Sequence, residues 1–147
     1  MPITIRVATA RDLPALRELF LRSRRDTFTW QPCHLFQLAD FDVQTEGERI
    51  LIAEEGMRLA GFVSVWEPDA FIHHLYVDGA FLRRGIARQL LNALPDWPLT
   101  RYRLKCLVRN LGALRFYEAT GFVEVGRGTS DDGDFLLLES PRAEGAD

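Results

Sequence analysis

The chain has 147 residues, of which 47% are hydrophobic and 27% charged, and this suits one globular domain with its own core. Its formal net charge of −3 argues against a nucleic-acid partner. No apolar run approaches the length that a membrane-spanning helix needs, so a membrane partner is not expected either.

Cysteine usage and the N-terminal residues indicate where such a protein works. Cys33 and Cys106 lie far apart and are not spaced as metal ligands, so neither a disulfide framework nor a metal site is predicted. Residues 1–6 lack the apolar region of a signal peptide. We expect a cytoplasmic location, one domain over residues 1–140 and a disordered tail over 141–147.

The first half of the chain is predicted to contain two helices and four strands. Alternating apolar residues indicate a strand over residues 3–7, and Thr9 can cap the helix that follows. A second helix is expected around residues 32–39, inside an aromatic-rich stretch. Three antiparallel strands come next, over 49–54, 59–66 and 71–77, and the first two form a hairpin at Glu55-Gly56.

The second half alternates helices and strands. A helix over residues 85–94 stops at Pro95, and a strand is expected over 103–108. Another helix follows, and then a hairpin whose strands, 122–125 and 135–138, flank a polar loop. The order βααβββαβαββ is that of an α+β domain, with a mixed, mostly antiparallel central sheet of about seven strands flanked by about four helices.

The loop after the strand at 71–77 leads into a helix with no side-chain cap. Helix N-termini present unpaired N–H groups and a partial positive charge, which suit a phosphate. Ser, Thr, Asp or Asn would normally consume those donors, but Arg83 and Arg84 stand here, followed by Gly85. The loop therefore predicts a site for a polyanionic ligand.

A second motif begins at Asn110, which can cap a short amphipathic helix that Gly121 ends in the left-handed conformation. Together the two segments resemble the GNAT superfamily of acetyl-CoA-dependent N-acetyltransferases. The pyrophosphate loop of that family, Gln/Arg-x-x-Gly-x-Gly/Ala, falls on residues 82–87, which match at Gly85 and Ala87 and depart from it at Leu82. The later signature, Asn-x-x-Ala-x-x-Phe-Tyr-x-x-x-Gly-Phe, matches at Asn110, Ala113, Phe116, Tyr117, Gly121 and Phe122.

The resemblance implies the fold given above and acetyl-CoA as co-substrate, without a metal. It makes the strands that end at Val77 and Val108 parallel neighbours that splay apart, with the pantetheine arm between them. Asn110 could face the cofactor as well as cap its helix. The side chains of Arg83 and Arg84 could contact the CoA phosphates or could instead be solvated. The cofactor-binding residues that the resemblance implies are Leu75, Tyr76, Val77, Arg83, Arg84, Gly85, Ile86, Ala87, Asn110 and Tyr117.

Acetyl transfer to an amine needs a base for the ammonium proton and an acid for the departing thiolate. The resemblance places the Tyr117 hydroxyl near the thioester sulfur as the acid, whereas the alternative is a packed core tyrosine. His73 is the candidate base because related arylalkylamine N-acetyltransferases carry a catalytic histidine at the matching strand position. There are three alternatives: His73 has only a structural role, Glu67 or Asp69 is the base, or a water chain takes the proton. Strand alternation predicts that only one of His73 and His74 faces the cleft.

The sequence thus predicts an N-acetyltransferase that acetylates a primary amine of a small molecule or peptide by direct attack in a ternary complex. The alternative is a catalytically inactive acyl-CoA-binding sensor or interaction module. A nucleotide-binding protein is disfavoured because no Gly-x-x-x-x-Gly-Lys-Ser/Thr is present. Four aromatic residues could line the acceptor pocket, or could equally form core or a homodimer surface: Phe28, Trp30, Phe36 and Phe41.

Overall fold

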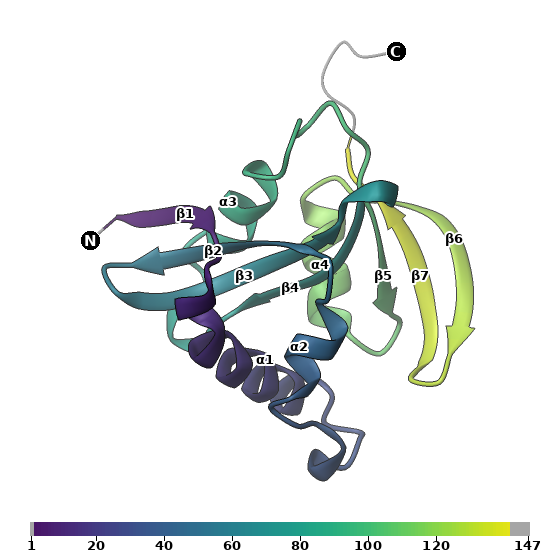
Figure 1. Cartoon of the computed structure of the whole chain (residues 1–147). Helices are drawn as coiled ribbons and strands as arrows, with labels where there is room; N and C mark the ends of the chain where they lie inside the picture. Colours follow the sequence, from purple (N-terminus) through teal and green to yellow (C-terminus); the bar gives the residue numbers. More distant parts are fainter. Residues whose placement is uncertain (1, 142–147) are drawn as a thin grey trace.

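The computed structural model describes residues 2–141, which form one mixed sheet with helices on both faces (Figure 1). Its strand order is β1-β2-β3-β4-β5-β7-β6, and every neighbouring pair is antiparallel except β4 and β5. The strands are β1 (Ile3–Val7), β2 (Arg49–Glu55), β3 (Arg58–Trp66), β4 (Phe71–Val77), β5 (Arg103–Leu107), β6 (Val123–Ser130) and β7 (Gly133–Glu139). The helices are α1 (Leu13–Thr27), α2 (Asp40–Gln44), α3 (Ile86–Asn92) and α4 (Leu111–Ala119). The predicted α+β fold and element order are confirmed.

The two faces of the sheet carry separate hydrophobic cores, because successive side chains of a strand point to opposite faces. On β2, Leu51 and Ala53 join the core beneath α3 and α4, while Ile52 joins the core beneath α1 and α2. Phe20 and Phe62 are fully buried in the second core. Burying each such side chain stabilises the fold by about 1.5–3 kcal/mol. Among the described residues, no helix combines the length and hydropathy needed to cross a bilayer.

The second helix does not lie where its aromatic-rich sequence predicted it. Residues 32–39 contain only the 3₁₀ turn Cys33–Leu35, and the α-helix comes later, at Asp40–Gln44. Two arginines of α1 hold the intervening backbone instead: Arg25 donates to the Phe36 carbonyl at 3.0 Å, and Arg24 donates at 3.0 Å to Asp40, which also accepts from the amide of Gln37 at 2.9 Å. Contacts with α1 therefore replace local helix formation in this stretch.

The last hairpin is longer than its polar sequence predicted. The expected loop over residues 129–134 is largely strand, since Thr129 pairs with Asp134 and Ser130 with Gly133. Polar residues can extend a strand here because β6 is an edge strand that faces solvent. Only residue 141 of the predicted tail over 141–147 is described; the rest of that prediction lies outside the described residues.

Strands β4 and β5 separate soon after they meet. Their parallel ladder contains one residue pair, Phe71 with Arg103, and the two strands then diverge (Figure 1). The implied splaying is thus confirmed. Beyond that pair, the backbone edge of β4 over Leu75–Val77 forms no ladder with β5.

Candidate active site

A cavity of about 420 Å³ opens where β4 and β5 separate. Its walls come from these two strands, from α4 and the residue before it, from the α1–α2 region and from the β6–β7 hairpin. The lining residues are Arg24, Phe28, Gln31, Phe36, Gln44, Phe71, Ile72, His73, His74, Leu75, Tyr76, Lys105, Cys106, Leu107, Asn110, Ala113, Tyr117, Ser130, Asp132 and Phe135. Segments far apart in the sequence therefore share one concave space.

Both adjacent histidines of β4 line this cavity. The register with β3 shifts at this point: Ser64 pairs with His74, Val65 pairs with Ile72, and His73 is the extra residue of a β-bulge. The bulge interrupts the alternation of the strand, and the two imidazole rings stack with centroids 3.9 Å apart. The prediction that only one histidine faces the cleft is therefore wrong.

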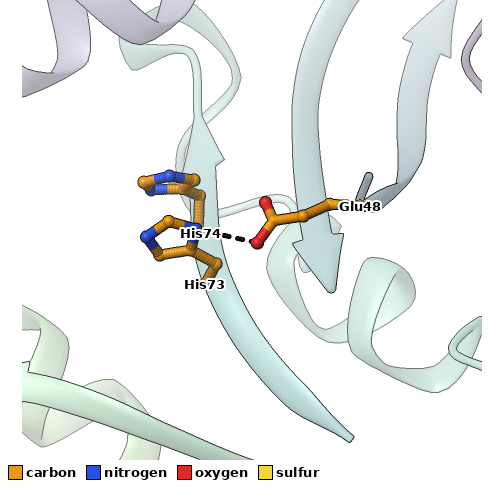
Figure 2. Close-up of side chains that lie close together, drawn as sticks. All are labelled: Glu48, His73 and His74. Atoms are coloured by element: carbon orange, nitrogen blue, oxygen red, sulfur yellow. Dashed lines mark hydrogen bonds and ion pairs between the residues drawn. The ribbon is translucent and has the colours of Figure 1, made fainter. Parts of the chain in front are cut away.

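His73 is paired with an acid that sequence reasoning missed. Its Nδ1 lies 2.8 Å from Oε2 of Glu48, the residue immediately before β2 (Figure 2). The Glu48 side chain is only 6% exposed, whereas that of His73 is 38% exposed. A carboxylate at Nδ1 favours the tautomer with its proton on that nitrogen and leaves Nε2 to accept another. No motif marks Glu48; only its proximity to His73 across β3 reveals it.

His74 has a different environment from its neighbour. Burial lowers the pKa of His74 to about 2, and the nearby His73 and Arg24 act in the same direction. Its ring meets Phe20 edge-on at 4.7 Å, and its Nε2 is buried without a hydrogen-bond partner among the described residues. His74 therefore stays neutral at physiological pH and is a poor proton acceptor.

The two histidines and Glu48 each offer a possible metal-ligand atom within 4.8 Å of the others. However, imidazole nitrogens bind a metal in the plane of the ring, and these two rings are stacked with planes only 26° apart (Figure 2). Nδ1 of His73 is moreover already bonded to Glu48. This arrangement suits proton transfer better than coordination of one ion.

The other predicted bases lie outside the cavity lining. Glu67 accepts a hydrogen bond from Arg49 at 2.9 Å, and neither Glu67 nor Asp69 lines the cavity. Among the three predicted bases, only His73 lines the cavity.

Tyr117 lies in a cluster of weakly acidic groups from three elements. Burial raises its pKa well above the usual tyrosine value, and nearby Cys106 and Tyr76 raise it further. Burial also raises the pKa of Tyr76 to about 12 and that of Cys106 to about 11. All three therefore stay protonated at neutral pH, and Cys106 is not a thiolate nucleophile.

The predicted caps hold the helix that carries Tyr117. The Asn110 side chain accepts a hydrogen bond from the amide of Ala113 at 3.3 Å, and Asn110 also lines the cavity. Gly121 has the expected positive φ, 93°, and the amide of Phe122 donates to the Tyr117 carbonyl at 2.9 Å. The centroids of the Phe122 and Tyr117 rings lie 5.2 Å apart.

The predicted polyanion loop has an uncapped helix start. Gly85 is the N-cap of α3, with φ 74°, and makes no side-chain cap; a Cβ there would meet no atom within 4 Å. Arg83 is also left-handed, with φ 65°. Backbones of this type can turn successive N–H groups toward an anion. Ile86 anchors the helix in the core, and the Arg84 guanidinium pairs with Glu55.

The aromatic residues of the α1–α2 region divide between cavity and core. Phe28 and Phe36 line the cavity, and Trp30 packs behind Phe28 with ring centroids 5.4 Å apart. Phe41 is fully buried between α1 and the sheet, so it is a core residue rather than a pocket residue.

The Acetyltransferase (GNAT) family matches the chain over residues 13–122. The chain belongs to the GNAT acetyltransferase family. It is 30% identical over 129 residues to the [ribosomal protein bS18]-alanine N-acetyltransferase of Salmonella typhimurium, with 82% of this chain and 81% of that relative covered. GNAT membership and this relative identify the chain as an N-acetyltransferase, as the sequence predicted.

Solved GNAT structures share the fold. A GCN5-related N-acetyltransferase from Rhodopseudomonas palustris superposes with a TM-score of 0.76 at 19% identity, covering 96% of each chain. The spermidine N-acetyltransferase of Vibrio cholerae, in complex with CoA and spermine, gives a TM-score of 0.67 at 21% identity, covering 93% of this chain and 94% of the other.

Proposed function

We propose that this enzyme transfers an acetyl group from acetyl-CoA to a primary amine of a small molecule or peptide, by direct attack in a ternary complex. The observation that carries the proposal is one cavity lined by both His73, backed by Glu48, and the buried Tyr117. A base and an acid at one cleft are what amine acetylation requires. The CoA bound to the Vibrio cholerae relative supports the choice of co-substrate.

Two backbone features fit acetyl-CoA. The edge of β4 over Leu75, Tyr76 and Val77 can pair with the pantetheine amides, since it forms no ladder with β5. The amides from Arg83 to Ala87 can hold the pyrophosphate, with left-handed Arg83 and Gly85 shaping the turn. Acetyl-CoA supplies the thioester carbonyl and the thiolate leaving group. Arg84 reaches a phosphate only by leaving Glu55.

His73 is the proposed base. An alkyl ammonium resembling lysine has a pKa near ~10.4, so freeing it at neutral pH costs roughly 4–5 kcal/mol. His73 Nε2 takes this proton, and Glu48 stabilises the resulting imidazolium through Nδ1. The freed nitrogen attacks the thioester carbonyl carbon, and a C–N bond forms. As the C–S bond breaks, the thiolate takes the proton of Tyr117, and the second proton of the attacking nitrogen passes to the resulting phenolate.

Tyr117 is the proposed acid, since its phenol keeps its proton at neutral pH. A raised pKa makes a phenol a weaker acid, but the same surroundings raise the pKa of the Cys106 thiol to about 11. Burial also makes a departing thiolate more basic, which offsets part of the loss of acidity of the phenol.

Two measurements on the purified chain test the proposal: calorimetric binding of acetyl-CoA, and thiol release over a panel of small amines and alanine-starting peptides. We expect binding, together with thiol release that matches the acetylated amine seen by mass spectrometry. Binding without release on any acceptor would favour the sensor or interaction module, and absence of binding would refute the proposal.

We propose a primary amine as the acceptor and name no single compound, because the similar proteins are named for different amines. One is named for the alanine of a ribosomal protein, and another was solved with spermine. The cytoplasmic location and the homodimer stay predictions.

A further inference from the structure

One uncompensated positive charge lines the cavity. Lys105, the only lysine in the sequence, lies on β5 with its Nζ 4.8 Å from the ring centroid of Phe135. Among residues 2–141, no carboxylate lies within 4.0 Å of this ammonium group. An amine so placed is available to a ligand.

The other charged side chains of the cavity wall each make a polar contact. The Arg24 guanidinium pairs with Asp40 at 3.0 Å and lies over the Phe36 ring at 4.5 Å. The carboxylate of Asp132 accepts a hydrogen bond from Gln31 at 2.8 Å, at the tip of the β6–β7 hairpin. Among the described residues of the lining, Lys105 is therefore the cation that no carboxylate neutralises, while Asp132 keeps its negative charge at the tip of the hairpin.

The strand register places Lys105 opposite the proposed base. Phe71 and Arg103 form the single β4–β5 pair, and each strand then continues for two residues, to His73 and Lys105 respectively. Since the strands are parallel and begin to separate there, His73 and Lys105 lie on opposite sides of the opening.

We propose that Lys105 selects acceptors that carry a carboxylate as well as the reacting amine. Such an acceptor bridges the opening, with its amine at His73 and its carboxylate at Lys105. A charge-assisted hydrogen bond from the Lys105 ammonium group to the carboxylate holds the acceptor in this orientation. A second ammonium group, as in a polyamine, would meet repulsion. This inference rests on the proposed acetyltransfer.

The test uses matched acceptor pairs that differ only in carboxylate against carboxamide: apolar amino acids and their amides, and 4-aminobutyrate and its amide. The measured quantity is the ratio of kcat/KM for acid over amide. Because the two members differ in amine basicity, the decisive result is how this ratio changes between variants.

We expect Lys105→Met to lower the ratio by about 10-fold, Lys105→Glu to lower it further, and Lys105→Arg to keep most of it. Arg11→Met, which removes a positive charge from a residue outside the cavity lining, should keep the wild-type ratio. Acetyl-CoA binding shows that each variant folds. An equal ratio in wild type and Lys105→Met would overturn the proposal.

Failure of acetyltransfer itself has a different signature, since no member of any pair would then release thiol from the wild type. In that case, binding of acid and amide to the CoA-loaded protein decides the inference. Tighter binding of the acid by wild type, lost in Lys105→Met, supports it, and equal binding contradicts it.

Discussion

The loop at residues 82–87 and the cavity between β4 and β5 use different parts of the chain to meet a ligand. In the loop, Ile86 is buried in the core, Arg84 pairs with Glu55, and Gly85 leaves the backbone at the start of the helix uncovered by a side chain. In the cavity, side chains from widely separated segments converge. A backbone site needs a short stretch with the right φ angles, whereas a side-chain site needs the whole fold. The loop therefore suits the shared co-substrate, and the cavity suits selection of the acceptor.

The largest expected effect is on the loop. Gly85→Asp should weaken acetyl-CoA binding by at least ~100-fold, because it puts a carboxylate beside the amides and a side chain at φ 74°. Calorimetry measures this loss. Gly85→Ala is the matched control, since it keeps the backbone strain without the charge and should bind more tightly than the aspartate variant. Near-native binding by Gly85→Asp would remove this loop from the cofactor site.

Tyr117→Phe should leave acetyl-CoA binding unchanged while lowering turnover by about 100-fold, as expected for loss of a general acid. Tyr76→Phe removes another buried hydroxyl from the same cluster and should cost less than about threefold. Comparing kcat with the Kd for acetyl-CoA separates catalysis from binding. Unchanged turnover in Tyr117→Phe would rule out its role as acid.

His73→Gln should lower kcat/KM by about 10- to 100-fold, because the amide cannot take the ammonium proton. Glu48→Gln should have a smaller effect in the same direction, because it weakens stabilisation of the imidazolium. His74→Gln, which alters the adjacent ring, serves as control. If His73→Gln keeps the wild-type kcat/KM, a water chain takes the proton instead.

His74 predicts how stability depends on pH. Its pKa is about 2 in the fold against 6.5 for the free side chain, so below pH 6.5 the unfolded state binds a proton that the folded state does not. The free energy of unfolding therefore decreases as the pH falls below 6.5, because protonation of His74 stabilises only the unfolded state. Urea unfolding from pH 7 to 5 should show a loss of at most about 2 kcal/mol that His74→Phe reduces. If the free energy of unfolding changed with pH equally in wild type and His74→Phe, His74 would lie in a more solvated environment.

The smallest effect is expected at the cavity mouth. Gln31→Ala removes the hydrogen bond to Asp132 that joins the α1–α2 region to the last hairpin. An exposed neutral–charged bond of this kind is worth about 1 kcal/mol, so KM for the acceptor should change by less than about fivefold, with kcat retained. A large fall in kcat would instead tie this contact to the catalytic geometry.

Local signals predicted several features of β4 and α4 correctly. The capping by Asn110, the left-handed Gly121 and the bounds of β4 at Phe71–Val77 all appear as expected. Caps, turns and strand alternation depend on residues close in the sequence, which is why pattern reasoning reaches them.

What the amino-acid sequence determined by itself is the order of elements, the GNAT family and the two motifs that frame the cofactor loop and Tyr117. Only the tertiary structure decided the rest: the bulge that turns both histidines into the cavity, the partnership of Glu48 with His73, and the position of α2. The physical reason is separation along the chain. Register against β3, a carboxylate 25 residues from its histidine and a contact that spans 101 residues become defined only once the sheet has assembled.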